Sequence, residues 1–117
     1  MSQTYTDVEL IVVDDGSTDK SPALIDQLVA KYPGRIIFLR QIQKGPYPAR
    51  NYGLENASGE FVAFLDADDW WRDEFLEKMR NALMDNKNAI LSYCGWQNVG
   101  LKGGRGNPHV PPDYEKE

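Results

Sequence analysis

The chain has 117 residues and a formal net charge of −5, from 13 Lys and Arg against 18 Asp and Glu. That length suits one domain with its own apolar core. The negative charge argues against nucleic-acid binding by phosphate neutralisation. A lone cysteine, Cys94, excludes an intrachain disulfide framework and a zinc site of several cysteines. Since no apolar run nears the about 20 residues of a membrane span and no signal peptide follows Met1, we expect a cytoplasmic protein.

The first third of the chain reads as strand, helix and strand. A β-branched run predicts a strand over 8–13, and its near-continuous apolarity is typical of a strand covered on both faces. Ser21 predicts a helix N-cap, with Pro22 at the first helical position. The sequence Tyr-Pro-Gly at 32–34 ends this helix, and a second strand is predicted over 35–39.

The middle of the chain repeats this alternation. A loop is predicted over 44–48, followed by a short helix that ends near Gly59. The apolar run at 61–65 predicts a third strand.

From residue 73 the chain adds one helix and one strand before the pattern dissolves. An amphipathic helix is predicted over 73–85 and a fourth strand over 89–93. The glycines and prolines that follow predict an irregular or disordered tail over 96–117. The order of elements predicts one α/β domain over 1–95, with a mostly parallel sheet and flanking helices.

Two acidic clusters directly follow predicted strands. Asp14 and Asp15 follow the first strand, and Asp66, Asp68 and Asp69 follow the third. Ligands of parallel α/β sheets lie outside the carboxyl ends of the strands, so both clusters fall where a ligand is expected. Carboxylates without clustered His or Cys favour Mg²⁺ or Mn²⁺. If the extended conformation continues past the third strand, the side chains of Asp66 and Asp68 face the same way. The alternative is that these acids cap helices and form Asx-turns.

Three sequence blocks carry a resemblance to a known family. They are Val-Val-Asp-Asp-Gly-Ser-Thr-Asp at 12–19, Gly45-Pro46 followed by Ala-Arg-Asn-Tyr-Gly-Leu at 49–54, and Gly-Glu-Phe-Val-Ala-Phe-Leu-Asp-Ala-Asp-Asp-Trp at 59–70. In this order they closely resemble the family 2 glycosyltransferases of the GT-A fold. The resemblance implies a Rossmann-like nucleotide-binding fold. It also implies transfer of a sugar from a nucleotide-activated donor, most commonly a UDP-sugar, to an acceptor hydroxyl with the help of a divalent cation.

The resemblance also assigns roles to individual residues. Asp15 would bind the nucleotide base, Arg50 would lie beside the base and donor, and Asp66 would approach the ribose. Asp68 would bind the Mg²⁺ or Mn²⁺ that bridges the diphosphate, where a cation neutralises charge on the leaving group. A competing interpretation makes Arg50 a surface residue that pairs with Glu55.

Departures from the family pattern imply that the chain is the amino-terminal, nucleotide-sugar-binding half, truncated at both ends. The family's first strand, which lies between the strands at 8–13 and 61–65, has no counterpart, nor has the acceptor-binding half with its catalytic base. We therefore expect a fragment that is inactive alone and leaves strand edges unpaired. Such edges favour marginal stability or pairing with a second copy of the chain. No catalytic residue is assigned.

The parent enzyme is expected to act on a cell-surface polysaccharide or glycolipid precursor, with a sugar or lipid-linked acceptor, at the inner face of the membrane. Two other classes share an acidic motif after a strand. A haloacid-dehalogenase-type phosphohydrolase needs Thr or Val where Trp70 stands. A non-enzymatic receiver-like domain needs Ser or Thr and Lys at later strand ends. Away from the motifs, Cys94 is expected in the core and His109 in a solvated loop.

Overall fold

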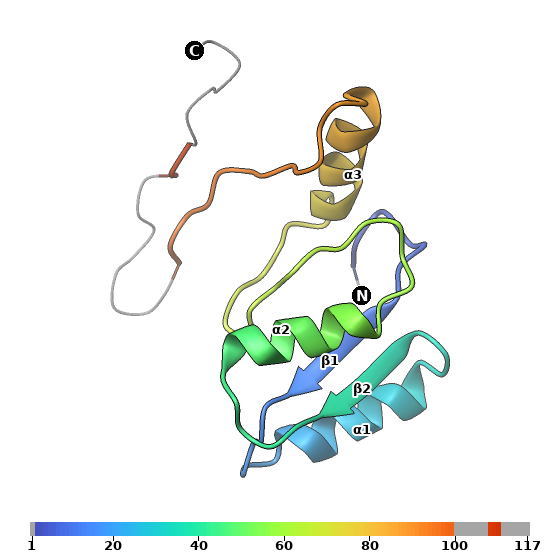
Figure 1. The fold of residues 1–117 in the computed structure, drawn as a ribbon, viewed down its shortest axis with the longest axis vertical. Helices are drawn as coiled ribbons and strands as arrows, with labels where there is room; N and C mark the ends of the chain where they lie inside the picture. Colours follow the sequence, from blue (N-terminus) through green and yellow to red (C-terminus); the bar gives the residue numbers. More distant parts are fainter. Residues whose placement is uncertain (1, 100–107, 111–117) are drawn as a thin grey trace.

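The computed structural model describes residues 2–99 and 108–110 and has the predicted α/β character (Figure 1). Its elements, in chain order, are β1 (Leu10–Asp14), α1 (Ser21–Lys31), β2 (Ile36–Arg40), α2 (Pro46–Glu55) and α3 (Phe75–Asp85). The strands β1 and β2 pair in parallel, with Leu10 opposite Ile36 and Asp14 opposite Arg40. Helix α1 packs against β2, and α2 packs against β1. A strand–helix–strand unit thus forms the base of the molecule.

Helix α1 begins one position away from the predicted cap. Ser21 is the first helical residue, and Lys20 holds the N-cap position without a side-chain capping bond. The Asp19 carboxylate accepts a hydrogen bond from the Ser21 backbone N–H at 2.9 Å. A negative charge at this end also interacts favourably with the helix dipole.

Helix α2 begins inside the stretch predicted to be a loop. Pro46 and Pro48 both lie in its first turn, where proline is tolerated because those N–H groups have no partner within the helix. Gly53 faces β1: a Cβ atom there would lie 3.3 Å from Cγ2 of Val13 and 4.0 Å from Cγ2 of Ile11. The missing side chain lets α2 lie close to the strand.

Helix α3 is fastened by the first residues of the chain. The amide of Gln3 donates to the Arg72 carbonyl at 2.7 Å and accepts from the Leu76 N–H at 3.0 Å. The Thr4 hydroxyl donates to Glu77 Oε2 at 2.7 Å. The residue at the N-cap position makes no side-chain capping bond. Gln3 therefore supplies the cap from a distant part of the sequence.

The predicted strands at 61–65 and 89–93 are wrong, since both segments run outside any ladder. A strand needs a neighbour to bond its backbone groups. The Leu10 N–H and the Asp14 carbonyl bond toward β2, so the intervening Ile11 and Val13 direct theirs to the opposite edge of β1. Among the described residues, β1 pairs with β2 alone. Without a strand between β1 and 61–65, this segment has no partner.

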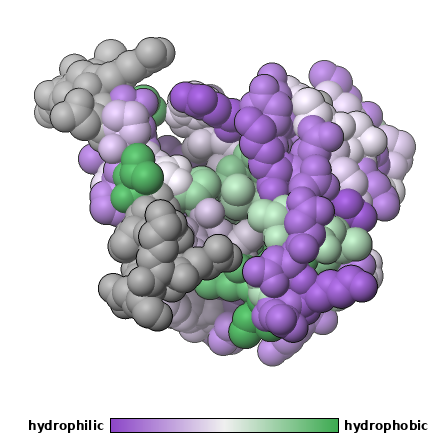
Figure 2. All heavy atoms as spheres, turned by 90° about the horizontal axis from the view of Figure 1, so that it is seen from above, coloured by the Kyte–Doolittle hydropathy of each residue, from purple (hydrophilic) through white to green (hydrophobic). Residues whose placement is uncertain are grey.

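Apolar side chains consequently reach the surface. Figure 2 shows green apolar atoms exposed among purple hydrophilic ones. Ile90, in the second unpaired segment, is 98% exposed, and Phe64, in the first, is 54% exposed. Within the described part of the chain, Ile36 is the one buried apolar residue. Cys94 is exposed, so its predicted place in the core is wrong for the same reason.

Of the predicted tail, the structure describes 96–99 and 108–110, and the rest of 96–117 lies outside the described residues. Trp96 and His109 form an antiparallel bridge, with N–H to carbonyl distances of 3.1 and 2.7 Å, and their rings lie 5.3 Å apart. His109 is exposed, as expected, and its backbone is paired with Trp96 in an isolated bridge. Helices long and apolar enough to cross a membrane are absent from the described ranges.

Candidate functional site

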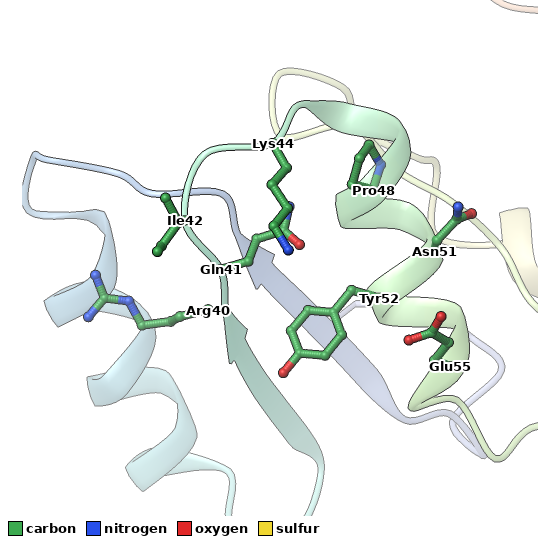
Figure 3. A pocket seen from close by; sticks show the side chains of 8 residues that line it. All are labelled: Arg40, Gln41, Ile42, Lys44, Pro48, Asn51, Tyr52 and Glu55. Atoms are coloured by element: carbon green, nitrogen blue, oxygen red, sulfur yellow. The ribbon is translucent and has the colours of Figure 1, made fainter.

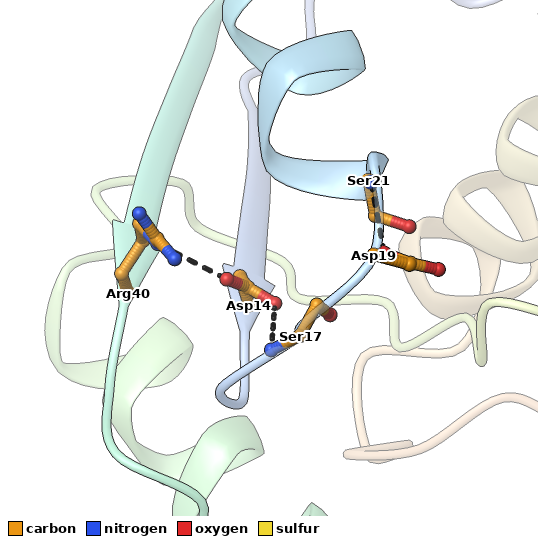
Figure 4. A network of polar contacts seen from close by, with 5 residues as sticks. All are labelled: Asp14, Ser17, Asp19, Ser21 and Arg40. Carbon is orange, nitrogen blue, oxygen red and sulfur yellow. Dashed lines mark hydrogen bonds and ion pairs between the residues drawn. The ribbon is translucent and has the colours of Figure 1, made fainter.

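Asp14 is a structural carboxylate at the end of β1 (Figure 4). Its side chain is 2% exposed and lies 3.1 Å from Arg40 Nε. The other oxygen accepts the Ser17 N–H at 2.9 Å. Hydrogen bonds from Ser17, with a smaller contribution from Arg40, hold the pKa of Asp14 below its ordinary value. Asp14 thus fastens the turn after β1 to β2 and is not presented to a ligand.

Asp15 binds the loop that leads into α2. Its Oδ1 accepts from Gln41 Nε2 at 2.7 Å and from the Lys44 N–H at 2.8 Å, and its Oδ2 accepts from the Gly45 N–H at 2.8 Å. These bonds, the one from Gln41 above all, lower the pKa of the carboxyl group. Asp15 therefore sets the position of the helix that carries Arg50.

Gly16 lets the turn after β1 and the 41–45 loop approach each other. A Cβ atom on Gly16 would lie 3.0 Å from the Gln43 backbone nitrogen, and its φ of 83° lies in the left-handed region that favours glycine. The two loops meet beside Asp15, and this close approach requires a residue without a side chain.

Arg50 and Asp66 form an ion pair between α2 and the acidic motif. Arg50 Nη2 lies 2.6 Å from Asp66 Oδ1, and the side chains are 38% and 55% exposed. The hydrogen bond and charge of Asp66 raise the pKa of Arg50. Arg50 also lies 5.9 Å from the ring centroid of Tyr47, three residues earlier on the same side of α2. The competing pairing with Glu55 is not formed.

The chain turns at the acidic motif. The Asp69 N–H donates to the Asp66 carbonyl at 3.0 Å, which closes a turn through Ala67 and Asp68. The expected continuation of the extended conformation past the third strand is therefore wrong. The alternation of side chains along a strand does not set the directions of the Asp66 and Asp68 carboxylates. Asp68 is exposed and makes no hydrogen bond or ion pair to any other residue in 2–99 or 108–110. Its oxygens are open to an external ligand.

Glu9 anchors the other end of the segment before the motif. Its Oε1 accepts from the Ser58 N–H at 2.6 Å, the Ser58 hydroxyl at 2.9 Å and the Gly59 N–H at 3.0 Å. The two Ser58 bonds are the main reason that the pKa of Glu9 is lowered. The unpaired stretch 60–65 is thus held at its start by Glu9 and at its end by the ion pair of Asp66.

Comparison with protein families places the chain in a known group. Residues 1–113 match the family described as Glycosyl transferase family 2. The chain belongs to glycosyltransferase family 2. The structure joins the second of the three sequence blocks, through Arg50, to the third, through Asp66.

Curated relatives agree with the family match. An uncharacterized glycosyltransferase of Haemophilus influenzae is 37% identical over 88% of this chain and 41% of its own length. One from Rickettsia typhi is 35% identical over all of this chain and 36% of its own length. A putative glycosyltransferase of Bacillus subtilis is 37% identical over 77% of this chain and 26% of its own length. The chain therefore spans less than half the length of these relatives.

The acidic side chains of this family 2 chain suit a divalent metal ion whose remaining ligands come from a substrate. In the part of the chain that the structure describes, no three His, Cys, Asp or Glu side chains are placed to bind a metal ion. Asp66 and Asp68 offer carboxylate oxygens two residues apart. Mg²⁺ commonly takes one or two protein carboxylates and completes its shell with water and substrate phosphates. Asp68, which makes no hydrogen bond or ion pair within 2–99 and 108–110, leaves its carboxylate open to such a cation.

A separate hollow of about 560 Å³ lies between the loop after β2 and α2 (Figure 3). Its walls come from both elements: Arg40, Gln41, Ile42, Lys44, Pro48, Asn51, Tyr52 and Glu55. Asp15, Arg50, Asp66 and Asp68 do not line it. Pro48, Tyr52 and Glu55 lie on a side of the helix different from that of Arg50, as the helical repeat requires. The hollow and Arg50 are therefore on different sides of α2, whereas Asp15 contacts Gln41 and Lys44 in the wall of the hollow.

Sequence reasoning missed Tyr47, Gln41 and Glu9 as members of this site. The spacing of Tyr47 and Arg50, three residues apart in a helix, could have indicated their contact. Gln41 and Glu9 gave no such signal, because their partners are brought near only by the fold.

Proposed function

We propose that this family 2 chain forms the donor half of a glycosyltransferase. It binds a nucleoside-diphosphate sugar, a UDP-sugar in our proposal, together with Mg²⁺ or Mn²⁺, for sugar transfer to an acceptor hydroxyl. The observation that supports this most directly is the Arg50–Asp66 ion pair, formed two residues before the exposed carboxylate of Asp68. Arg50 offers a positive charge for the phosphates, and Asp68 offers a carboxylate for the metal ion. A metal-bound diphosphate needs both.

Asp15 is proposed to bind the nucleotide base while it holds the 41–45 loop. An ionised carboxylate has about four lone-pair sites, and the loop uses three of them. One site is left for an N–H of a base. Because the same carboxylate fixes the start of α2, base binding and the position of Arg50 are linked through one side chain.

Asp68 is proposed to hold the cation, and Arg50 and Asp66 to contact the diphosphate and the ribose. A bound cation would stabilise the negative charge that develops on the departing diphosphate. Transfer also needs a carboxylate that deprotonates the acceptor hydroxyl, and we assign that base to no residue here. The whole protein's proposed acceptor is a cell-surface polysaccharide or glycolipid precursor, at the cytoplasmic side of the membrane.

Calorimetric titration with UDP, with and without Mn²⁺, tests the proposal. We expect Mn²⁺-dependent binding that is lost in Asp68→Ala. Asp26→Ala is the matched control, because it removes an exposed carboxylate from α1, away from the motif. Equal losses in both variants, or no UDP binding by a folded sample, would contradict the proposed donor site.

A further inference from the structure

The two side chains proposed to contact the donor occupy each other in this structure. Arg50 Nη2 donates to Asp66 Oδ1 at 2.6 Å. This single bond leaves Arg50 other N–H groups and leaves Asp66 other lone pairs. A phosphate held bidentately by the guanidinium edge that now faces Asp66 would take the N–H that the carboxylate accepts. Donor binding through this edge therefore competes with the ion pair.

The ion pair is weak enough to be exchanged. Both side chains are well exposed, at 38% and 55%, and exposed ion pairs change an equilibrium constant by no more than about fivefold. Charge-assisted bonds from a guanidinium to a phosphate are commonly bidentate and stronger. A diphosphate is thus the better partner for Arg50, and the energetic loss on leaving Asp66 is small.

Tyr47 keeps Arg50 in place when Asp66 is released. The guanidinium carbon lies 5.9 Å from the ring centroid, on the same helix. Tyr47 as a residue is 75% exposed, so it packs little against the rest of the protein. A cation over an aromatic ring is attracted without needing its carboxylate partner. Tyr47 is therefore a positioning residue for Arg50.

The acidic motif at 66–69 can also shift while the start of its segment stays bound to Glu9, the residue before β1. Glu9 holds Ser58 and Gly59 through three bonds to a single oxygen, independently of Asp66. The other end of the segment carries the turn at 66–69. Release of the Asp66 side chain would therefore change the motif locally while the start of the segment stays anchored.

We propose that Arg50 and Asp66 exchange partners when the donor binds: the guanidinium leaves Asp66 for the diphosphate, and the freed carboxylate binds the ribose hydroxyls. The ion pair then serves as a placeholder that keeps both groups near their ligand positions in the free protein. This inference rests on the proposed function.

A double-mutant cycle tests the exchange through UDP affinity in the presence of Mn²⁺. The variants are Arg50→Gln, Asp66→Asn and the combination, and thermal unfolding confirms that each is folded. If the pair breaks on binding, each single variant loses one ligand contact but no longer has to break the pair. The loss in the double variant then exceeds the product of the two single losses, by about two- to fivefold.

The opposite sign overturns the inference. If the ion pair persists in the complex and acts as a unit, the double variant loses as much as or less than the product of the single losses. Lys78→Gln combined with Asp26→Asn is the control cycle, because these exposed residues lie on different helices and we expect no coupling between them. Failure of the proposed function looks different, since the unaltered chain would then bind no UDP at all, and the exchange would fail with it.

Discussion

The side-chain oxygen of Gln3 accepts a hydrogen bond from the Leu76 N–H at 3.0 Å, across 73 positions of sequence. The N-cap residue of helix α3 makes no side-chain capping bond, so the bond to Gln3 satisfies one of the N–H groups that lack a partner within the helix. We expect Gln3→Ala to destabilise the protein by about 1 kcal/mol, as the loss of a capping residue does. Urea unfolding measures the change. Gln27→Ala, on exposed α1, is the control and should change stability little; equal effects would contradict the capping role.

Substitution of Gly16 tests the close approach of the two loops beside Asp15. Gly16→Ala forces a side chain into a left-handed conformation and places Cβ 3.0 Å from the Gln43 nitrogen. We expect a loss of about 2–3 kcal/mol, from backbone strain and from the contact. Gly34→Ala is a matched control, since its φ is 74° but no atom lies within 4 Å of the added Cβ. If chemical unfolding shows the same loss for both, the approach to Gln43 is of no consequence.

The ring of Tyr47 is predicted to matter for donor affinity, and its hydroxyl is not. Tyr47→Phe keeps the aromatic face beneath Arg50 and should bind UDP like the unaltered chain. Tyr47→Ala removes the face and should weaken binding about two- to fivefold, the strength of an exposed cation–π contact. Calorimetry in the presence of Mn²⁺ separates the two variants. Equal losses in Phe and Ala would mean that the hydroxyl is the functional group.

Stability should fall on acidification. The pKa values of Asp14, Asp15, Asp19 and Glu9 are all lowered by hydrogen bonds in the folded state. A group with a lowered folded pKa contributes fully above its ordinary value, which is 3.8 for aspartate and 4.5 for glutamate. That contribution is lost as the pH falls through the lowered pKa, because the carboxyl group is then protonated in the folded state as well as in the unfolded state.

Urea midpoints measured from neutral pH down to below the ordinary aspartate value check this expectation. Asp15→Asn should flatten the pH dependence, since the amide keeps the side chain's size but does not titrate. Asp26→Asn is the control and should leave the slope unchanged. A midpoint that rises on acidification would contradict the assignment of these carboxylates as stabilising groups.

The free edge of β1 predicts weak folding or self-association. Ile11 and Val13 direct backbone groups away from β2, and apolar residues at 61–65 are exposed beside no strand. Unpaired edges of this kind are templates for pairing with another chain. Size-exclusion chromatography with light scattering, combined with unfolding curves, measures both properties. A monomer that unfolds cooperatively at high denaturant concentration would contradict the expectation.

Local patterns predicted well those elements that have local causes. The apolar run before Asp14 and the helical spacing after Ser21 indicated β1 and α1 to within a few residues. The run at 61–65 carries the same kind of signal, yet it forms no strand. Pairing depends on a neighbour that no local pattern supplies. Propensity thus identified where strands could form, and the availability of a partner decided which of them did.

The site shows the same limit. Asp15, Arg50, Asp66 and Asp68 were selected as ligand-binding residues, and the structure brings Arg50 and Asp66 together. The partners of Asp15, in contrast, are the Gln41 side-chain amide and two backbone N–H groups of a loop 26 to 30 positions later, which local sequence cannot indicate. Local sequence also offered Glu55 as a partner for Arg50, whereas the fold supplies Asp66 from outside the helix.

The bonds of Gln3 and Thr4 also have a consequence for proteolysis. Helix α3 shares no extensive contact with β1, β2, α1 or α2, and the first residues of the chain are its most clearly defined attachment. Regions held by few contacts open at low free energy. A protease cut shortly after Thr4 would therefore release α3 to rapid digestion and leave the β1–β2 unit protected.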